Sequence, residues 1–348
     1  MNAHTSSRKV KKVLLILALM VMLGCSFPLK VTLGISGTPT PSPTLAATAT
    51  ATLALQATPE PGTENNPLIL ALVPSAHPDA TVIAAGDAMA AYIEARTGYR
   101  VVTINPNTEV ELVTALSKGN AHIASLSPYA YALARQDDSV AALFAQTREG
   151  EAFYGAQIIV NREKDFTPYY DEARGENTGN VDIALQQFQE KKPCWSDEVS
   201  PSGYVIPLGL LKQASVEPRS GAFLEGQPNV VRAVYADDIC DFGATYSDAR
   251  TSPILEADYP DVMDKVRVVW RIPPIIPYQN ISMSTRLPFE MRRVVQRALI
   301  DYMLTPEGRN TLQTVYGIDE MQPVEDSAYD EFVQLVLASG LDLASLIE

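Results

Sequence analysis

The chain has 348 residues, of which 46% are apolar and 20% are charged, and this composition excludes both global disorder and a membrane protein with many spans. It contains 27 Lys plus Arg against 41 Asp plus Glu, so we expect no nucleic-acid partner. With only three histidines and three cysteines, and without an HExxH or paired CxxC motif, the chain is not expected to hold a metal centre or a cofactor.

Residues 1–24 have the pattern of a secretory signal peptide. Basic residues at 8–12 precede an apolar run at 13–23, which is shorter than the roughly 20 residues needed to span a bilayer. The end of the run, Met-Leu-Gly-Cys, is similar to the lipobox of bacterial lipoproteins, in which the cysteine is acylated after cleavage. We therefore expect Cys25 to be the lipid-bearing mature N-terminus, and a plain signal peptide or signal anchor is the alternative.

Residues 25–65 are expected to form a lipidated linker. The stretch is rich in threonine and proline and has no acidic residue before Glu60. Such a segment cannot bury enough apolar surface to offset the entropy lost on ordering. It predicts an extended tether between the membrane and the folded part of the chain.

The folded part begins with alternating strands and helices. The apolar run at 68–73 is typical of a strand buried in a parallel sheet, and apolar residues at helical spacing follow it up to a glycine stop. Thr108 and Glu111 form a capping box for the next helix. The expected elements are a strand at 68–73, a helix from 82 to 96, a strand at 99–104, a helix from 108 to 116, a strand at 121–126, a helix from Pro128 and a strand at 155–161.

A second series follows the polar stretch 171–180. Three prolines, at 273, 274 and 277, then break regular structure where we expect the chain to cross back to the first lobe. The expected lobes are 66–160 plus 275–348 and 161–274. The elements predicted for the second lobe are a helix at 181–189, a strand at 192–195, a helix at 204–214, a β-α-β passage at 222–243 and a strand at 266–270.

Two cysteines remain after Cys25. Outside the cytosol Cys194 and Cys240 can oxidise, and both lie in short strand-like stretches that open or close an αβ unit. We expect a disulfide between neighbouring strands, and two free buried thiols are the alternative.

The segment Ser200-Pro201-Ser202-Gly203-Tyr204 lies directly between a predicted strand and a predicted helix. Hydroxyl groups, a glycine that permits close backbone approach and the positive end of a helix dipole together favour binding of an oxyanion. The alternative is an ordinary serine cap at the start of a helix.

Two further strand-to-helix corners lie in the first lobe, one from Ser127 to Tyr131 and one from Ser75 to His77. Open α/β sheets bind ligands beyond the carboxyl ends of their strands, so we expect the corner at 127–131 and the serine corner to face one crevice. The corner at 75–77 is a third of the same kind, where His77 could donate to a ligand. The alternatives are that the corner tyrosines cover the sheet edge and that His77 is a surface imidazole. His122 lies in an apolar strand and is expected in the core.

Five segments, in this order, resemble the substrate-binding proteins of bacterial phosphate, phosphite and phosphonate ABC importers. They are LALVPS at 70–75, ASLSPYAY at 124–131, SPSGYVIP at 200–207, VVWRIPP at 268–274 and PVEDSAYD at 323–330, and the resemblance covers residues 66–335. It implies an α/β fold of the type II periplasmic-binding-protein kind, with two doubly wound lobes joined by two crossings that close on a tetrahedral oxyanion.

The resemblance also implies roles for individual residues. Two positions depart from the family pattern: Pro201 lacks a hydroxyl and an N–H group, and Gln227 stands where a histidine is frequent in relatives. By motif match, the anion loop would be supplied by Ser200, Ser202, Gly203 and Tyr204, and Tyr131 would close over it from the other lobe.

We therefore expect a monomeric, extracytoplasmic solute-binding lipoprotein that captures a small phosphorus oxyanion and delivers it to an ABC permease of the cytoplasmic membrane. The sequence does not choose among phosphate, phosphite and phosphonates. A receptor that reports the ligand to a membrane signalling protein is one alternative. A secreted hydrolase or transferase that uses Ser202 and His77 is another, although no GxSxG elbow is present.

Overall fold

The computed structural model describes residues 59–348. The expected signal peptide, the expected lipidation site Cys25 and most of the expected linker lie outside the described residues. Within 59–348, the helices are too short or too polar to cross a bilayer.

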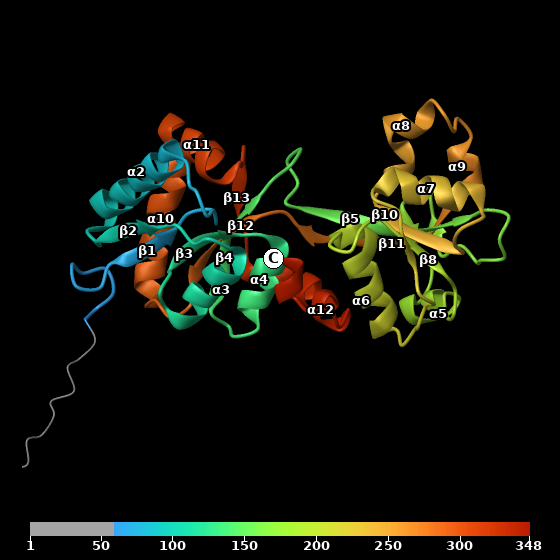
Figure 1. Ribbon diagram of the computed structural model, residues 1–348, viewed down its shortest axis with the longest axis horizontal. Helices are drawn as coiled ribbons and strands as arrows, with labels where there is room; N and C mark the ends of the chain where they lie inside the picture. Colours follow the sequence, from blue (N-terminus) through green and yellow to red (C-terminus); the bar gives the residue numbers. More distant parts are fainter. Residues whose placement is uncertain (1–58) are drawn as a thin grey trace, which may run out of the picture. The chain divides into compact units, whose positions relative to one another are not determined.

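The first lobe is built on a six-stranded sheet of order β13-β4-β12-β3-β1-β2, in which β1 runs parallel to β2 and β3 (Figure 1). Buried apolar side chains of β1, α2 and α10 form the main part of its core. The strands are β1 (Leu68–Ala71), β2 (Val101–Ile104), β3 (Ile123–Leu126), β4 (Val140–Gln146), β12 (Asn280–Ser284) and β13 (Met321–Pro323). The helices are α2 (Ala80–Thr97), α3 (Glu109–Lys118), α4 (Pro128–Arg135), α10 (Phe289–Met303), α11 (Pro306–Thr311), the π-helical turn η3 (Leu312–Tyr316), η4 (Asp326–Tyr329), α12 (Asp330–Ala338) and η5 (Ala344–Leu346).

The second lobe is built on a five-stranded sheet of order β11-β5-β10-β8-β9. Its strands are β5 (Phe153–Asn161), β8 (Pro193–Trp195), β9 (Ala222–Phe223), β10 (Phe242–Tyr246) and β11 (Val266–Pro277), and a small hairpin pairs β6 (Tyr170–Asp171) with β7 (Glu176–Asn177). Its helices are α5 (Val181–Gln186), the π-helical turn η1 (Pro201–Val205), α6 (Ile206–Gln213), α7 (Gln227–Ala236), η2 (Ala249–Thr251), α8 (Pro253–Glu256) and α9 (Val262–Lys265). The expected fold, two α/β lobes joined by two crossings, is confirmed.

Local signals set the helix ends of the first lobe. The Thr108 hydroxyl accepts a hydrogen bond from the Glu111 N–H group at 3.1 Å and so caps α3. Gly98 and Gly119 end α2 and α3 in the left-handed conformation, with φ of 76° and 77°. Both stops were predicted from the sequence.

The first crossing lies earlier than the sequence predicts. We expected β5 to close the first lobe at residue 160, but β5 pairs antiparallel with β10 and β11 of the second sheet. The chain therefore crosses at residues 147–152, between β4 and β5. The apolar pattern of β5 fits a buried strand of either sheet, because periodicity does not specify the partner strand.

The return crossing also differs from the prediction. Pro273 and Pro274 were expected to end the strand, but β11 continues through them with a register shift against β5. Gly155 faces this irregularity, and a Cβ atom there would lie 2.6 Å from the Ile272 carbonyl oxygen. The extra residues are accommodated as a bulge, and the chain crosses back at residues 278–279.

The C-terminal helix α12 packs against α4 of the first lobe and α6 of the second. A Cβ atom on Gly209 of α6 would overlap the Leu335 carbonyl oxygen, so the two helices approach as closely as their backbones allow. Lys212 adds a hydrogen bond from Nζ to the Ser339 carbonyl oxygen at 2.6 Å. The two lobes are thus linked by a helix contact in addition to the two crossings.

His122 is buried beside β3, as the sequence predicts. Its Nδ1 atom accepts a hydrogen bond from the Ile69 N–H group of β1 at 2.9 Å. Burial lowers the pKa of the imidazole below its ordinary value. The neutral ring is therefore part of the pairing between β1 and β3.

This geometry predicts a loss of stability in acid. In the unfolded chain His122 takes up a proton below about pH 6.5, whereas the folded state takes it up only at lower pH, so the stabilisation is complete above that pH. The free energy of unfolding should fall as the pH drops from about 6.5 towards the folded pKa, by at most about 1.4 kcal/mol per pH unit from this group. Urea unfolding at several pH values in this range should show a smaller fall in the free energy of unfolding per pH unit for His122→Asn. The asparagine amide oxygen can accept the same hydrogen bond and does not titrate. An equal fall in the free energy of unfolding for the two proteins would contradict this role of His122.

Candidate functional site

A cleft of about 560 Å³ lies between elements of the two lobes. Among the described residues, those that line it include no aspartate, glutamate, histidine or cysteine, and no cluster within 59–348 has the ligands for a metal ion. The lining residues are Pro128, Gln146, Arg148, Tyr154, Ser200, Ser202, Gln227, Tyr246, Ser247, Pro277, Tyr278 and Gln279.

The serine corner forms one wall of this cleft. The Ser200 hydroxyl accepts a hydrogen bond from the Gly203 N–H group at 3.1 Å and so caps the helical segment that starts with η1 and continues as α6. Pro201 occupies the first helical position, where a missing N–H group costs nothing. Gly203 is required because a Cβ atom there would overlap the Ser196 side chain. Ser200 is therefore a helix cap and a cleft residue at the same time.

The side-chain amide of Gln227, the first residue of α7, connects the serines. Its Nε2 atom lies 3.1 Å from the Ser200 Oγ atom, 3.3 Å from the Ser196 Oγ atom and 3.4 Å from the Ser202 Oγ atom. Its Oε1 atom accepts a hydrogen bond from the Tyr246 N–H group at 3.1 Å, which fixes the orientation of the amide. The amide nitrogen can only donate, and it has two hydrogens for these three oxygens. The serine oxygens that accept from it can direct their hydroxyl hydrogens elsewhere.

Aromatic rings and one cation form the wall nearest the crossings. The Tyr154 and Tyr278 rings stack with centroids 5.1 Å apart, and the Arg148 guanidinium lies 4.6 Å from the centroid of the Tyr278 ring. Burial raises the pKa of Tyr154 to about 12, although a hydrogen bond with the Ser202 hydroxyl opposes the shift. The Tyr154 hydroxyl therefore keeps its proton and can donate it in a hydrogen bond.

Three helical segments begin at the cleft. Pro128 opens α4, Pro201 opens the η1–α6 segment and Gln227 opens α7, and the cleft is lined by residues of all three. The positive ends of their dipoles favour an anion. With Arg148 and the hydroxyl donors, the arrangement is suited to binding an oxyanion.

The two tyrosines expected at the site do not line the cleft. Tyr131 is fully buried, and its hydroxyl donates a hydrogen bond to the Asp326 Oδ1 atom at 2.6 Å. Tyr204 packs between Trp195 and Phe223, with ring centroids 5.4 and 4.9 Å away. Both rings pack against apolar neighbours inside their own lobe. The structure therefore corrects the expectation that Tyr131 closes over the anion loop and that the Tyr204 side chain contributes to it.

Of the two corners of the first lobe, the one at 127–131 reaches the cleft of the serine corner through Pro128, and the one at 75–77 does not. The Ser127 hydroxyl donates to the Glu109 Oε2 atom at 2.7 Å and caps α4, next to the cleft residue Pro128. The Ser75 hydroxyl accepts from the His77 N–H group at 3.2 Å, and His77 is exposed. The common crevice expected for the corners at 127–131 and 200–204 is therefore present, although the Ser127 side chain does not line it, and the Ser75 and His77 side chains lie outside it.

Several cleft residues were missed from the sequence. Arg148, Tyr154 and Tyr278 lie in or beside the crossings, and no local motif distinguishes them. Tyr129 was considered only as a cover for the sheet edge, but its hydroxyl donates a hydrogen bond at 3.0 Å to the carbonyl oxygen of Val199, immediately before the serine corner. The position of the crossings in the sequence was the signal that could have identified Arg148, Tyr154 and Tyr278.

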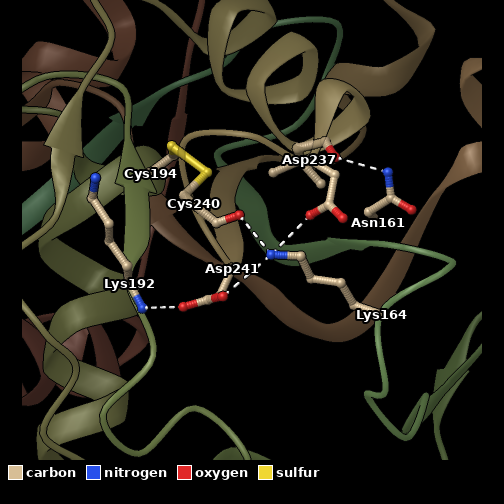
Figure 2. Close-up of a disulfide and its surroundings, with 8 residues drawn as sticks. Asn161, Lys164, Lys192, Cys194, Asp237, Cys240 and Asp241 are labelled. Carbon is tan, nitrogen blue, oxygen red and sulfur yellow. Dashed lines mark hydrogen bonds and ion pairs between the residues drawn. A yellow bond between two sulfur atoms is a disulfide. The ribbon is translucent and has the colours of Figure 1, made fainter.

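A disulfide joins Cys194 of β8 to Cys240, with Cα atoms 5.7 Å apart, within the range that a disulfide can bridge (Figure 2). The Lys164 Nζ atom donates to the Cys240 carbonyl oxygen at 3.1 Å and pairs with Asp237 and Asp241 at 2.8 and 3.2 Å. β8 leads to Ser196, and α7 runs from Gln227 to the loop that contains Cys240. The disulfide therefore ties together the two segments that carry the serine and glutamine cluster.

We expect the disulfide to contribute substantially to stability. It closes a loop with a sequence separation of 46 residues, for which the lost entropy of the unfolded chain corresponds to about 4 kcal/mol. Thiol labelling of the denatured, unreduced protein should modify neither cysteine, and the double variant Cys194→Ala/Cys240→Ala should unfold at a clearly lower urea concentration. Labelling of both cysteines without a reductant, or the same unfolding midpoint for the two proteins, would contradict this.

A family model and one solved structure agree with this architecture, and two further structures are similar at a lower level. The family model of the periplasmic substrate-binding protein of phosphonate ABC transporters matches residues 70–329. XAC2383 from Xanthomonas citri, solved bound to ATP, is 16% identical with a TM-score of 0.51, over 81% of this chain and 99% of that one. A binding protein component of a phosphonate ABC transporter from Pseudomonas aeruginosa is 16% identical, with a TM-score of 0.40, over 79% and 87% of the two chains. PhnD1 from Prochlorococcus marinus, in complex with methylphosphonate, is 13% identical, with a TM-score of 0.40, over 78% and 97%.

The family match covers most of the chain, and the family consists of solute-binding components of transporters rather than enzymes. Its extent agrees with the two lobes and the cleft between them. This chain belongs to the family of periplasmic substrate-binding proteins of phosphonate ABC transporters.

Proposed function

We propose that this protein binds a small phosphorus oxyanion, a phosphate, phosphite or phosphonate, in the cleft around Ser200, Ser202 and Gln227. The observation that carries this proposal is the Gln227 amide, which is placed to donate to the Ser200 and Ser202 oxygens. The Ser200 hydroxyl hydrogen can therefore be directed at a ligand, and the Ser202 hydroxyl hydrogen can turn from Tyr154 to the ligand. Hydrogen bonds to a charged acceptor are roughly twice as strong as neutral ones. A tetrahedral anion is the ligand for which such a set of donors is best suited.

The electrostatics of the cleft support an anionic ligand despite the acidic chain. The formal net charge is −14, but charges on the surface are screened beyond about 8 to 10 Å at physiological salt. Inside the cleft the fixed charge is Arg148, and the other polar groups are hydroxyls and amides. The local field is therefore set by donors and helix ends rather than by the net charge.

We further propose that the protein is an extracytoplasmic, monomeric lipoprotein that delivers this ligand to an ABC permease of the cytoplasmic membrane. The leader and the Met-Leu-Gly-Cys pattern support a lipid on Cys25, and the Thr- and Pro-rich stretch after it supports a tether to the membrane. Membership of a transporter family supports import.

A thermal-shift panel tests the ligand class. A compound that binds only the native state stabilises it by RT ln(1 + [L]/Kd), roughly 2.7 kcal/mol at a hundredfold excess over Kd. We expect the melting temperature to rise with one or more of phosphate, phosphite, methylphosphonate and aminoethylphosphonate, and not with amino acids. A clear response to another solute, without a response to any phosphorus compound, would refute the ligand class and leave the fold intact.

Ser202→Ala tests the assignment of the site. Loss of a hydroxyl that bonds a charged ligand typically costs about 1.5 to 3 kcal/mol, so calorimetry should show an affinity roughly ten- to a hundredfold lower. The control for loss of a hydroxyl outside the cleft is Thr305→Ala, because Thr305 caps α11 through a 2.9 Å bond from the Gly308 N–H group and does not line the cleft. This control should lose about 1 kcal/mol of stability and bind normally. If Ser202→Ala instead melts earlier and binds like the parent protein, the site is misplaced.

A further inference from the structure

One side of α10 is exposed and has a large apolar side chain at each end. Phe289 is the first residue of the helix and Leu304 follows its last residue. With exposed fractions of 67% and 72%, they are the two most exposed large hydrophobic side chains of residues 59–348. Positions 289, 293, 297, 300 and 304 follow one another at intervals of three or four residues, so they lie on one side of the helix. The two apolar side chains therefore belong to a single face.

The middle of this face is basic. Arg293 and Arg297 lie beside a hollow of about 450 Å³, which is also lined by Arg96 of the adjacent helix α2 (Figure 1). Among the described residues that line the hollow, the only carboxylate is Asp301, which pairs with Arg96 at 2.8 Å. The hollow thus has three positive charges and one negative charge, in a chain whose formal net charge is −14.

The two arginines of α10 are available to a partner. Within residues 59–348, no ion pair includes Arg297. Arg293 pairs with Glu290 at 2.9 Å, but the side chains of both are largely exposed, at 66% and 72%. An exposed pair of this kind contributes little free energy, so Arg293 can exchange Glu290 for another anion at little cost.

The described chain begins close to this face. Arg96 lies in the last turn of α2, and the Arg100 N–H group, just after that helix, donates a hydrogen bond to the Gly62 carbonyl oxygen at 2.7 Å. The 34 residues 25–58 can span at most roughly 110 to 120 Å. A lipid on Cys25 would keep the face within this distance of the bilayer, so that even a weak contact would be populated.

A bilayer with anionic headgroups fits this face best. The arginines complement the phosphates of the lipids, and Phe289 and Leu304 can enter the boundary between headgroups and acyl chains. The two apolar side chains are roughly 22 Å apart along the helix axis, which suits a continuous surface, whereas a protein partner would need a separate pocket for each. Acidic groups elsewhere on the protein are screened from the lipids beyond about 8 Å at physiological salt.

We propose that this face, made of Phe289, Arg293, Arg297 and Leu304 of α10 with Arg96 of α2, docks on an anionic lipid surface and holds the first lobe against the membrane. The inference goes beyond the proposed function, because the contact needs neither the phosphorus ligand nor a lipid anchor. A tether alone would leave the protein free to turn, whereas this contact fixes which side of the first lobe is turned to the membrane.

Co-sedimentation with lipid vesicles at physiological salt tests the proposal. The mature chain from residue 25 with Cys25→Ala cannot be acylated, so it binds only through its own surface. We expect it to partition at least about tenfold more strongly onto vesicles of equal parts phosphatidylcholine and phosphatidylglycerol than onto phosphatidylcholine alone, and to dissociate as salt is added. Equal partitioning onto the two kinds of vesicle, or no binding to either, would overturn the proposal and leave the proposed ligand binding untouched.

The double variant Arg293→Gln/Arg297→Gln tests the charges of the face. Each basic side chain near an anionic surface strengthens binding about fivefold, so this variant should bind the mixed vesicles roughly twentyfold more weakly. The matched control is Arg174→Gln/Arg219→Gln in the second lobe, which makes the same change in net charge at side chains that are 69% and 64% exposed and also paired with carboxylates. This control should bind like the parent protein. Equal weakening by the two double variants would show a general effect of net charge and overturn the assignment of the face.

Leu304→Trp tests whether the apolar end of the face enters the lipid. The native Trp195 and Trp270 are buried, so they contribute a constant background to the fluorescence. On the mixed vesicles, emission from the tryptophan introduced at position 304 should shift to the blue and be quenched by brominated acyl chains. Ile183→Trp, at a side chain that is 64% exposed in α5 of the second lobe, is the matched control and should not respond. Binding that depends on the arginines without quenching at position 304 would contradict insertion and favour an acidic protein as the partner.

Discussion

The antiparallel pairing of β5 with β11 is the constraint on which both the fold and the cleft depend. β5 begins directly after the first crossing and β11 ends directly before the second, and their register places Phe153 beside Pro277 and Tyr154 beside Ile276. The two crossings are thereby held next to each other. This pairing brings Tyr154 and Tyr278 into a stack, with Arg148 against the Tyr278 ring, although Tyr278 is far from the other two in the sequence.

Within the second lobe, the Gln227 amide also holds separate segments together, through hydrogen bonds of a single side chain. One side chain satisfies a backbone N–H group of β10 and the oxygens of the serine corner, so few polar groups remain unpaired when the cleft is empty. Networks of this kind hold their members in one geometry, which lowers the cost of ordering them when a ligand binds. A histidine at this position could change its charge near neutral pH, whereas glutamine cannot. The glutamine amide is therefore a donor whose charge does not depend on pH.

The sequence predicted features that depend on neighbouring residues. The cap of α3, the glycine stops of α2 and α3, the serine corner and the succession of strands and helices follow from signals within a few residues. The family resemblance likewise follows from short motifs in order. The partner of β5 and the bulge of β11 depend on pairing with distant strands, and periodicity does not contain that information. The tyrosines of α4 show the same limit. Side chains two positions apart on a helix point to different sides, so Tyr129 reaches Val199 while Tyr131 reaches Asp326.

The central claim, that the amide of Gln227 holds the serine hydroxyls as donors for an oxyanion, is tested most directly by a crystal structure of the complex with methylphosphonate. The claim predicts phosphonate oxygens about 2.5 to 3.0 Å from the Ser200 and Ser202 Oγ atoms, with the Gln227 Nε2 atom still directed at the serines. A phosphonate bound at the Ser75 and His77 corner, or one held by Gln227 while both serine hydroxyls point away, would contradict it.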